Sequence, residues 1–153
     1  MMEWMLMPLR RYAQFSGRSR RKDYWMFFLF VFIVWIVSIL VDVALSLAGV
    51  GRSWSGTLSS IFRLVILVPS IAVAVRRLHD TDRSGRWLWL VVLAGVPGAA
   101  IADRSFVLGM AIEAVGMIAA SIPLLFFLCQ DGTHGDNRFG PDPKEPNLTE
   151  ILA

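Results

Sequence analysis

The sequence predicts an all-α integral membrane protein: a four-helix transmembrane bundle with an N-terminal interfacial segment and an irregular cytoplasmic C-terminal tail. Four apolar stretches, at about residues 24–47, 56–75, 87–102 and 105–130, each approach the ~20 residues that an α-helix needs to cross a hydrocarbon core. The 153-residue chain is 56% hydrophobic, with a mean hydropathy of +0.58, which is too apolar for a soluble domain of this size. We therefore expect residues 1–153 to form a single membrane domain.

Residues 1–22 precede the first apolar stretch and are predicted to be a cytoplasmic or interfacial segment. Leu9 and Tyr12 recur near helical spacing, with Arg10 and Arg11 beside them, which is typical of a short helix lying in the membrane interface. Such a helix would start or bend at Pro8. A frayed tail is the alternative.

The first stretch, 24–47, is the clearest of the four, because no residue from Tyr24 through Val41 is charged. It is too long for the 7–15-residue apolar core of a signal peptide, so a membrane span is favoured. Ser19 is a candidate cap for this helix, and Asp23 in the first turn suits the helix dipole.

The other three stretches contain features that a simple span would lack. The second carries Arg63 and the fourth carries Glu113, whereas the third has only about 16 uncharged residues and contains Pro97 and Gly98. The third stretch is either a short tilted span or a re-entrant hairpin, which would need cover from protein because lipid cannot satisfy backbone polar groups. We favour four spans, followed by a cytoplasmic tail over 131–153.

The basic residues predict the orientation in the membrane. With four spans, twelve Lys and Arg residues fall on the side that holds both termini and the loop 76–86, whereas the other side holds Arg52 and Arg104. The positive-inside rule then places both termini in the cytoplasm. The formal net charge of +3 does not indicate nucleic-acid binding, because these cations adjoin apolar spans and meet anionic lipid headgroups first.

Three cytoplasmic segments carry a recognisable pattern: FSGRSRRKDYW at 15–25, RRLHDTDRSGRW at 76–87 and GDNRFGPDP at 135–143. Together they resemble the bacterial inner-membrane family called domain of unknown function 805, and the likeness runs from about Phe15 to Pro143. One departure is Arg86, where the family commonly has Trp. The resemblance implies a small protein with several spans and no established activity.

These segments bring a set of polar residues into one cytoplasmic layer, and several interpretations of that layer are open. One is a structural collar in which Asp80 and Asp82 pair with arginines of the first segment and the tail folds under the bundle. Another is an anion site, because guanidinium groups suit phosphate oxygens. A metal site on His79, Asp80, His134 and Asp136 has no recognised ligand spacing behind it. The candidate lipid- or partner-binding residues are Arg18, Arg20, Arg76, Arg77, His79, Asp80, Asn137 and Arg138.

Asp42, Arg63 and Glu113 form a second group, because they place charges inside three different spans. Each lies roughly 9–12 Å from the outer end of its span at ~1.5 Å per residue, so the three share one level. Ionisable residues at this depth usually face other helices. We expect Arg63 to pair with Asp42, Glu113 or both, either as a structural clasp or as a proton- or ion-responsive site. Charges that reach the outer surface are the remaining alternative.

The function predicted from these features is non-enzymatic binding of anionic lipid headgroups, or of a partner protein, by the cytoplasmic arginine-rich layer. A small ion- or proton-coupled transporter or channel component that uses Asp42, Arg63 and Glu113 is the alternative, and four spans would then need several copies of the chain to enclose a pore. No placed nucleophile points to an enzyme. We expect neither a cofactor nor a metal.

Overall fold

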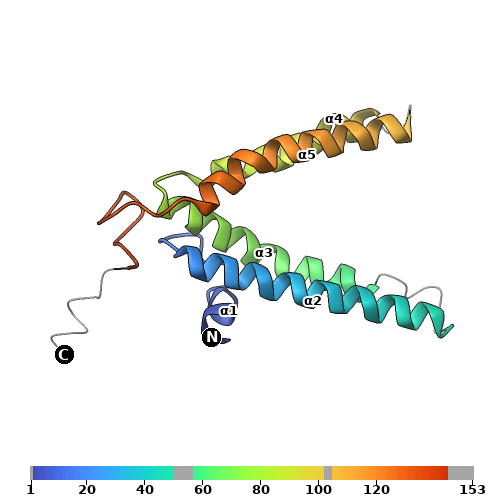
Figure 1. Cartoon of the computed structure of the whole chain (residues 1–153), viewed down its shortest axis with the longest axis horizontal. Coiled ribbons are helices and arrows are strands. Elements are labelled where there is room, and N and C mark those ends of the chain that lie inside the picture. Colours follow the sequence, from blue (N-terminus) through green and yellow to red (C-terminus); the bar gives the residue numbers. More distant parts are fainter. Residues whose placement is uncertain (1, 50–56, 102–104, 145–153) are drawn as a thin grey trace.

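The computed structural model describes residues 2–49, 57–101 and 105–144, and over these residues the chain is helical (Figure 1). The elements in order are α1 (Met2–Arg10), α2 (Arg21–Leu47), α3 (Thr57–Asp80), the 3-10 helix η2 (Gly85–Leu88), α4 (Trp89–Ile101) and α5 (Phe106–Cys129). The predicted outer turns, at 49–56 and around Asp103 and Arg104, lie largely outside the described residues, as do tail residues 145–153.

Three of these helices are long and apolar enough to cross a membrane, namely α2, α3 and α5. The fourth apolar helix, α4, has 13 residues. It continues through Pro97 as one helix, so the stretch does not turn back on itself as a re-entrant hairpin would. Together η2 and α4 extend about 28 Å at ~2.0 and ~1.5 Å per residue, which is close to the ~30 Å hydrocarbon thickness.

The helices are arranged as two antiparallel pairs, α2 with α3 and α4 with α5 (Figure 1). The pairs meet where α2 begins and where α3 and α5 end, and they diverge from there, so the arrangement differs from the predicted four-helix bundle. The physical reason is that the apolar cores are local. Phe27, Ile66 and Val73 pack α2 against α3, whereas Leu78 and Leu124 connect α3 to α5 near the junction. Farther out, large apolar side chains face outward, as lipid hydrocarbon allows.

The N-terminal segment forms the helix α1 and is not a frayed tail. It packs on α2 and α3, with Leu9 against the apolar cluster around Phe27. Beyond it, the Tyr12 hydroxyl donates a hydrogen bond of 2.5 Å to the Val65 carbonyl. Pro69 lies four residues after Val65 and has no N–H for that carbonyl, so the hydroxyl of Tyr12 replaces the missing helical bond.

The start of α2 differs from the predicted cap at Ser19. The capping residue is Arg20, whose backbone N–H donates to the Asp23 carboxylate at 3.2 Å. Ser19 is instead buried, and its backbone N–H donates to the Arg76 carbonyl at 3.1 Å. The predicted first-turn position of Asp23 is confirmed, and Ser19 fixes the entering chain to the end of α3.

Close packing of α4 against α5 depends on Gly116. A Cβ atom at this position would lie 2.7 Å from the Ala94 carbonyl oxygen, and a backbone atom cannot move aside. We expect Gly116→Ala to push the helices apart and lower the free energy of unfolding in detergent by about 1–3 kcal/mol, the usual cost of overpacking. Ala114→Val, at an exposed position of α5, is the matched control and should change little. Equal effects of the two substitutions would contradict the close approach.

Candidate functional site: a buried arginine–aspartate clamp

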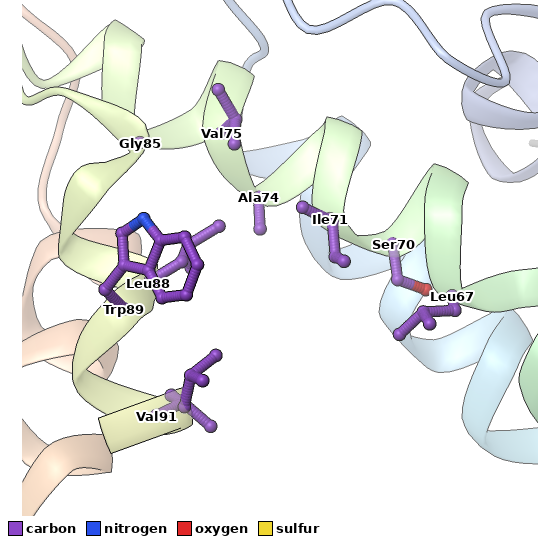
Figure 2. A pocket seen from close by; sticks show the side chains of 10 residues that line it. Leu67, Ser70, Ile71, Ala74, Val75, Gly85, Leu88, Trp89 and Val91 are labelled. Atoms are coloured by element: carbon purple, nitrogen blue, oxygen red, sulfur yellow. The ribbon is translucent and has the colours of Figure 1, made fainter. Parts of the chain in front are cut away.

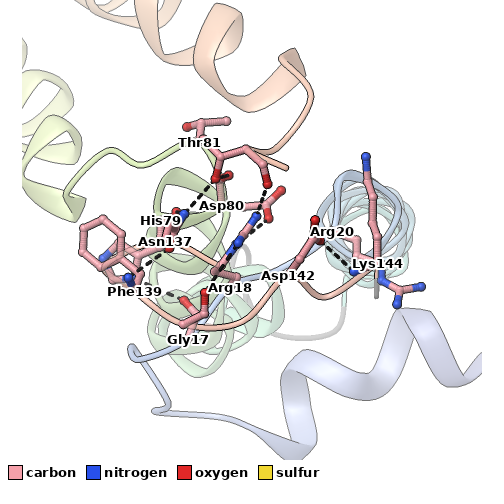
Figure 3. A network of polar contacts seen from close by, with 12 residues as sticks. Gly17, Arg18, Arg20, His79, Asp80, Thr81, Asn137, Phe139, Asp142 and Lys144 are labelled. Atoms are coloured by element: carbon pink, nitrogen blue, oxygen red, sulfur yellow. Dashed lines mark hydrogen bonds and ion pairs between the residues drawn. The ribbon is translucent and has the colours of Figure 1, made fainter. Parts of the chain in front are cut away.

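Asp80, the last residue of α3, lies between two buried arginines, Arg77 and Arg18, of which Figure 3 labels Arg18. Arg18 donates from Nε to Asp80 Oδ1 at 3.0 Å, and Arg77 donates from Nη1 to Asp80 Oδ2. The side chains of Arg18, Arg77 and Asp80 are 1%, 0% and 3% exposed. We call these three residues the clamp. Its two cations against one carboxylate leave an excess positive charge that only surrounding oxygen atoms can offset.

Backbone carbonyl groups supply those oxygens. Arg77 donates from Nε to the Leu128 carbonyl at 3.1 Å and from Nη2 to the Gln130 carbonyl. These carbonyls lie at the C-terminal end of α5, where helical carbonyls lack intrahelical partners and attract cations. The clamp therefore joins the end of α3 to the end of α5. The two residues of the Arg77–Leu128 hydrogen bond are 51 positions apart in the sequence.

Arg18 brings the C-terminal tail into the same arrangement. Its terminal nitrogens donate to the carbonyls of Gly135 and Thr133, both at 2.6 Å. Thr133 in turn donates its backbone N–H to the Asp80 carbonyl at 2.8 Å. These hydrogen bonds fix three segments to one another: the segment before α2, the end of α3 and the tail.

The tail closes over His79 through a second set of contacts. The rings of His79 and Phe139 stack 3.9 Å apart and 4° from parallel, and His79 Nδ1 lies 3.2 Å from the Gly17 carbonyl oxygen. Asn137 donates from Nδ2 to the His79 carbonyl at 3.0 Å, and its own Oδ1 accepts from the backbone N–H of Phe139 at 2.9 Å (Figure 3). His79 and Asn137 therefore hold the tail in place.

The last described turn of the tail is organised by Asp142. Its carboxylate accepts from the backbone N–H of Lys144 at 2.9 Å and from that of Gly135 at 3.1 Å. These hydrogen bonds, the one from Lys144 foremost, hold the pKa of Asp142 below its ordinary value.

The lowered pKa of the Asp142 carboxyl group makes the stability of the folded tail depend on pH. Because the folded state favours the ionised Asp142, its stabilising contribution is present above the unfolded pKa of about 4 and is lost as the pH falls through the folded value. We expect hydrogen-exchange protection of residues 133–142 to be constant from pH 7 to 5 and to fall below about pH 4. Asp142→Asn should weaken the protection at pH 7 and flatten this dependence. A full acid response in that variant would contradict the assignment.

Three exposed ion pairs among the described residues lie outside the clamp. Arg138 pairs with Asp82 at 3.0 Å, and Asp131 pairs with Arg21 at 3.0 Å and with Lys144 at 3.7 Å. All five side chains are between 47% and 68% exposed, so solvent screens these pairs. Arg138 is therefore an accessible cation, unlike Arg18 and Arg77.

Arg76 and Arg20, the remaining predicted arginines, do not join the clamp. Arg76 is 2% exposed, and its Nε donates to the Ala72 carbonyl at 3.3 Å. Its Nη2 atom and the Asp23 Oδ1 atom are both buried without a hydrogen-bond partner among the described residues. Arg20 is half-buried at the start of α2.

Sequence reasoning missed two residues that shape the clamp. Thr133 links the tail to the end of α3, and Gly132 passes so close to Asp80 that a Cβ atom there would lie 2.2 Å from Oδ2. The glycine content of the tail was the available signal, but only the three-dimensional structure shows which glycine meets the carboxylate. The proposed metal ligands His79 and Asp80 are engaged elsewhere, by Phe139 and by the two arginines.

The three intramembrane charges do not meet as predicted. Asp42 accepts from the backbone N–H groups of Leu58 at 3.2 Å and Ser59 at 2.9 Å, so it caps the start of α3. The guanidinium of Arg63 lies 5.6 Å from the centre of the Trp35 ring, and Glu113 is exposed on α5. No ion pair among the described residues joins Arg63 to either carboxylate. The reason is that α5 diverges from α3 and that helix N–H groups occupy Asp42.

This capping role predicts different effects for two substitutions of Asp42. Asp42→Ala removes the acceptor for two backbone N–H groups and should lower the free energy of unfolding by about 0.5–2 kcal/mol. Asp42→Asn keeps an oxygen acceptor and should cost less. The measurement is equilibrium unfolding in detergent for both variants. Equal losses would show that the charge, and not capping, is what matters.

A groove of about 540 Å³ opens between the two helix pairs near their junction (Figure 2). Apolar side chains from α3, η2 and α4 line it, with Leu67 and Ile71 on one wall and Leu88 and Trp89 on the other. Trp89 also borders a second hollow of about 260 Å³, which the exposed Arg86 lines. Trp89 thus connects the groove to a hollow that contains a cation.

The fold and the clamp define a class: a helical integral membrane protein whose span-length helices are joined at one end by buried arginine–aspartate contacts. More specifically, the chain belongs to the family described as "Protein of unknown function (DUF805)", whose profile matches residues 12–141. This match confirms the resemblance inferred from the sequence, and the matched range contains the whole clamp.

Named relatives agree with this assignment. The chain is 38% identical over 143 residues to "Inner membrane protein YhaI" of Escherichia coli K12, covering 94% of this chain and 97% of that protein. Identity to "Inner membrane protein YhaH" of the same strain is also 38%, over 94% and 98% of the two chains. "Uncharacterized protein YiiR" is 31% identical over 86% of each chain. No solved structure matches this chain.

Proposed function

We propose that this chain is a non-enzymatic inner-membrane protein that binds an anionic phospholipid at its cytoplasmic face, with both termini in the cytoplasm. The single observation that carries the proposal is that the apolar groove between α3 and the η2–α4 segment shares Trp89 with a second hollow, which Arg86 lines. An acyl chain suits the groove, and a phosphate group suits the exposed guanidinium. Trp87 and Trp89, both exposed, have the side chains that favour headgroup depth.

The burial of the clamp argues against Arg18 and Arg77 as lipid-binding residues. Arg18 and Arg77 have 1% and 0% exposed side chains and already bind Asp80 and backbone carbonyls. A headgroup would have to displace those partners to reach them. The Arg86 side chain is exposed and makes no hydrogen bond or ion pair with another described residue, so its charge is available to a phosphate group.

Lipid retention tests this proposal. The protein is reconstituted in vesicles of phosphatidylglycerol and phosphatidylcholine, extracted gently and examined by native mass spectrometry. We expect the wild type to retain phosphatidylglycerol preferentially and Arg86→Gln to lose that preference several-fold. Arg138→Gln removes another exposed cation, in the tail, and is the matched control. Equal preference in the wild type and Arg86→Gln would reject this site, and binding of a protein in its place would favour the partner interpretation.

Ion or proton coupling is the second candidate and depends on the charges within the spans. With Asp42 engaged as a cap, Arg63 and Glu113 remain as the charges that transport would use. Flux through proteoliposomes that is absent, or unchanged by Glu113→Gln, would remove this candidate.

A further inference from the structure

Arg63 and Glu113 carry opposite charges on different helix pairs, at matching distances from the clamp. The clamp joins Arg77 to Leu128, which gives a common reference level on α3 and α5. At 1.5 Å per residue, Arg63 lies about 21 Å along α3 from Arg77, and Glu113 lies about 22 Å along α5 from Leu128. Both are therefore at the same depth on the two diverging arms.

No ion pair compensates either charge within the described part of the chain. Arg63 faces the Trp35 ring at 5.6 Å, and the side chain of Glu113 makes no hydrogen bond or ion pair with a described residue. A charged side chain near the middle of a membrane helix costs at least ~2.5–3.5 kcal/mol for Arg or Asp, so such residues normally face protein or water. The divergence of α3 and α5 prevents the two from meeting in one protomer (Figure 1).

The residue types around the two charges are complementary. Arg63 borders a hollow of about 350 Å³ lined by aromatic side chains of α2 and α3, including Phe28, Phe32 and Trp35. On α5, Met110 and Met117 flank Glu113 at helical spacing and are 55% and 37% exposed. Methionine side chains adapt to irregular hollows and make favourable contacts with aromatic rings.

We propose that two copies of this chain associate in the membrane by pairing Arg63 of one protomer with Glu113 of its partner, and the reverse. Two copies inserted in the same direction place these residues at the same depth, and a two-fold axis along the membrane normal makes both pairs equivalent. Met110 and Met117 of one protomer then enter the aromatic hollow beside Arg63 of the other. The proposal is independent of lipid binding at Arg86, which lies at the junction of the two arms.

Charge reversal provides a direct test, because it predicts which chains can pair. The Arg63→Glu variant carries carboxylates at both positions and the Glu113→Arg variant carries guanidinium groups at both, so neither can pair with itself. Co-expressed together, the two variants are complementary. The readout is co-purification of an untagged copy with a tagged copy after reconstitution in nanodiscs or vesicles.

We expect tagged wild-type protein to co-purify the untagged wild-type copy. For each reversal variant, the amount of its own untagged copy that co-purifies, called self-recovery below, should fall at least tenfold. When the two variants are co-expressed, co-purification of one with the other should return. Self-association of a reversal variant at the wild-type level, or failure of the mixed pair, would overturn the proposal. Arg63→Gln and Glu113→Gln cover the case in which a reversed charge prevents folding, since both must also weaken self-recovery. Arg86→Gln is the control for lipid binding and should leave recovery unchanged.

Discussion

Replacing Asp80 by Ala should lower the free energy of unfolding by about 3–5 kcal/mol, the usual cost of breaking a buried ion pair from one side. The carboxylate is the anion that both Arg18 and Arg77 bind, and all three side chains are at most 3% exposed. Its removal leaves two buried guanidinium groups with only backbone carbonyls as partners. Equilibrium unfolding in detergent, with limited proteolysis of the tail, measures the effect.

Asp82 offers a matched control two residues away. Its ion pair with Arg138 is exposed, at 47% and 61% for the two side chains, and its φ is 55°, which Asn tolerates better than Ala. Asp82→Asn should therefore cost no more than about 1 kcal/mol. Asp80→Asn is the matched change in the clamp, because it also keeps the size of the side chain and removes only the charge. If Asp80→Asn and Asp82→Asn destabilised the protein equally, the clamp would not be the main support of this junction.

Replacing Gly132 by Ala should release the tail from the clamp. The new Cβ atom would lie 2.2 Å from Asp80 Oδ2 and 2.6 Å from its Cγ. The carboxylate cannot swing aside, because Arg18 and Arg77 hold one oxygen each. The tail must move instead, and the backbone bond from Thr133 to Asp80 lengthens or breaks. We expect a loss of about 2–4 kcal/mol, combining overpacking with one or two buried hydrogen bonds.

Proteolysis shows whether this loss is local. Residues 131–144 should become rapidly cleavable in Gly132→Ala, while the helical signal of the membrane-embedded part stays unchanged. His134→Ala is the control, because this exposed side chain lies two residues away on the same tail. A tail that stays protected in Gly132→Ala would mean that the close approach to Asp80 can relax without cost.

The sequence identified the apolar helices because hydrocarbon thickness imposes a length that can be counted along the chain. It also brought Arg18, Arg77 and Asp80 together as one polar layer, since the charge bias and the turns put their segments at the same membrane face. The structural-collar interpretation of that layer describes their geometry better than an open anion site does. What the sequence could not show is that Arg18 and Arg77 are buried, because burial depends on where the tail folds.

The intramembrane charges are a second case in which the sequence could not predict which residues contact one another. Equal depth for Asp42, Arg63 and Glu113 followed from residue counting, but depth does not define direction around a helix axis or the angle between helices. Asp42 turned out to face the start of α3, and Glu113 lies on an arm that diverges from Arg63.

By itself, the sequence determined that this is a helical membrane protein of the DUF805 family, with its arginines concentrated at one end of its spans. Composition and hydropathy suffice for that, because lipid selects apolar segments of fixed length and repels charge. Only the tertiary structure decided that two helix pairs diverge from a buried clamp, leaving a groove between them. That outcome depends on short-range contacts between residues more than 50 positions apart, such as Arg18 with Asp80 and Arg77 with Leu128.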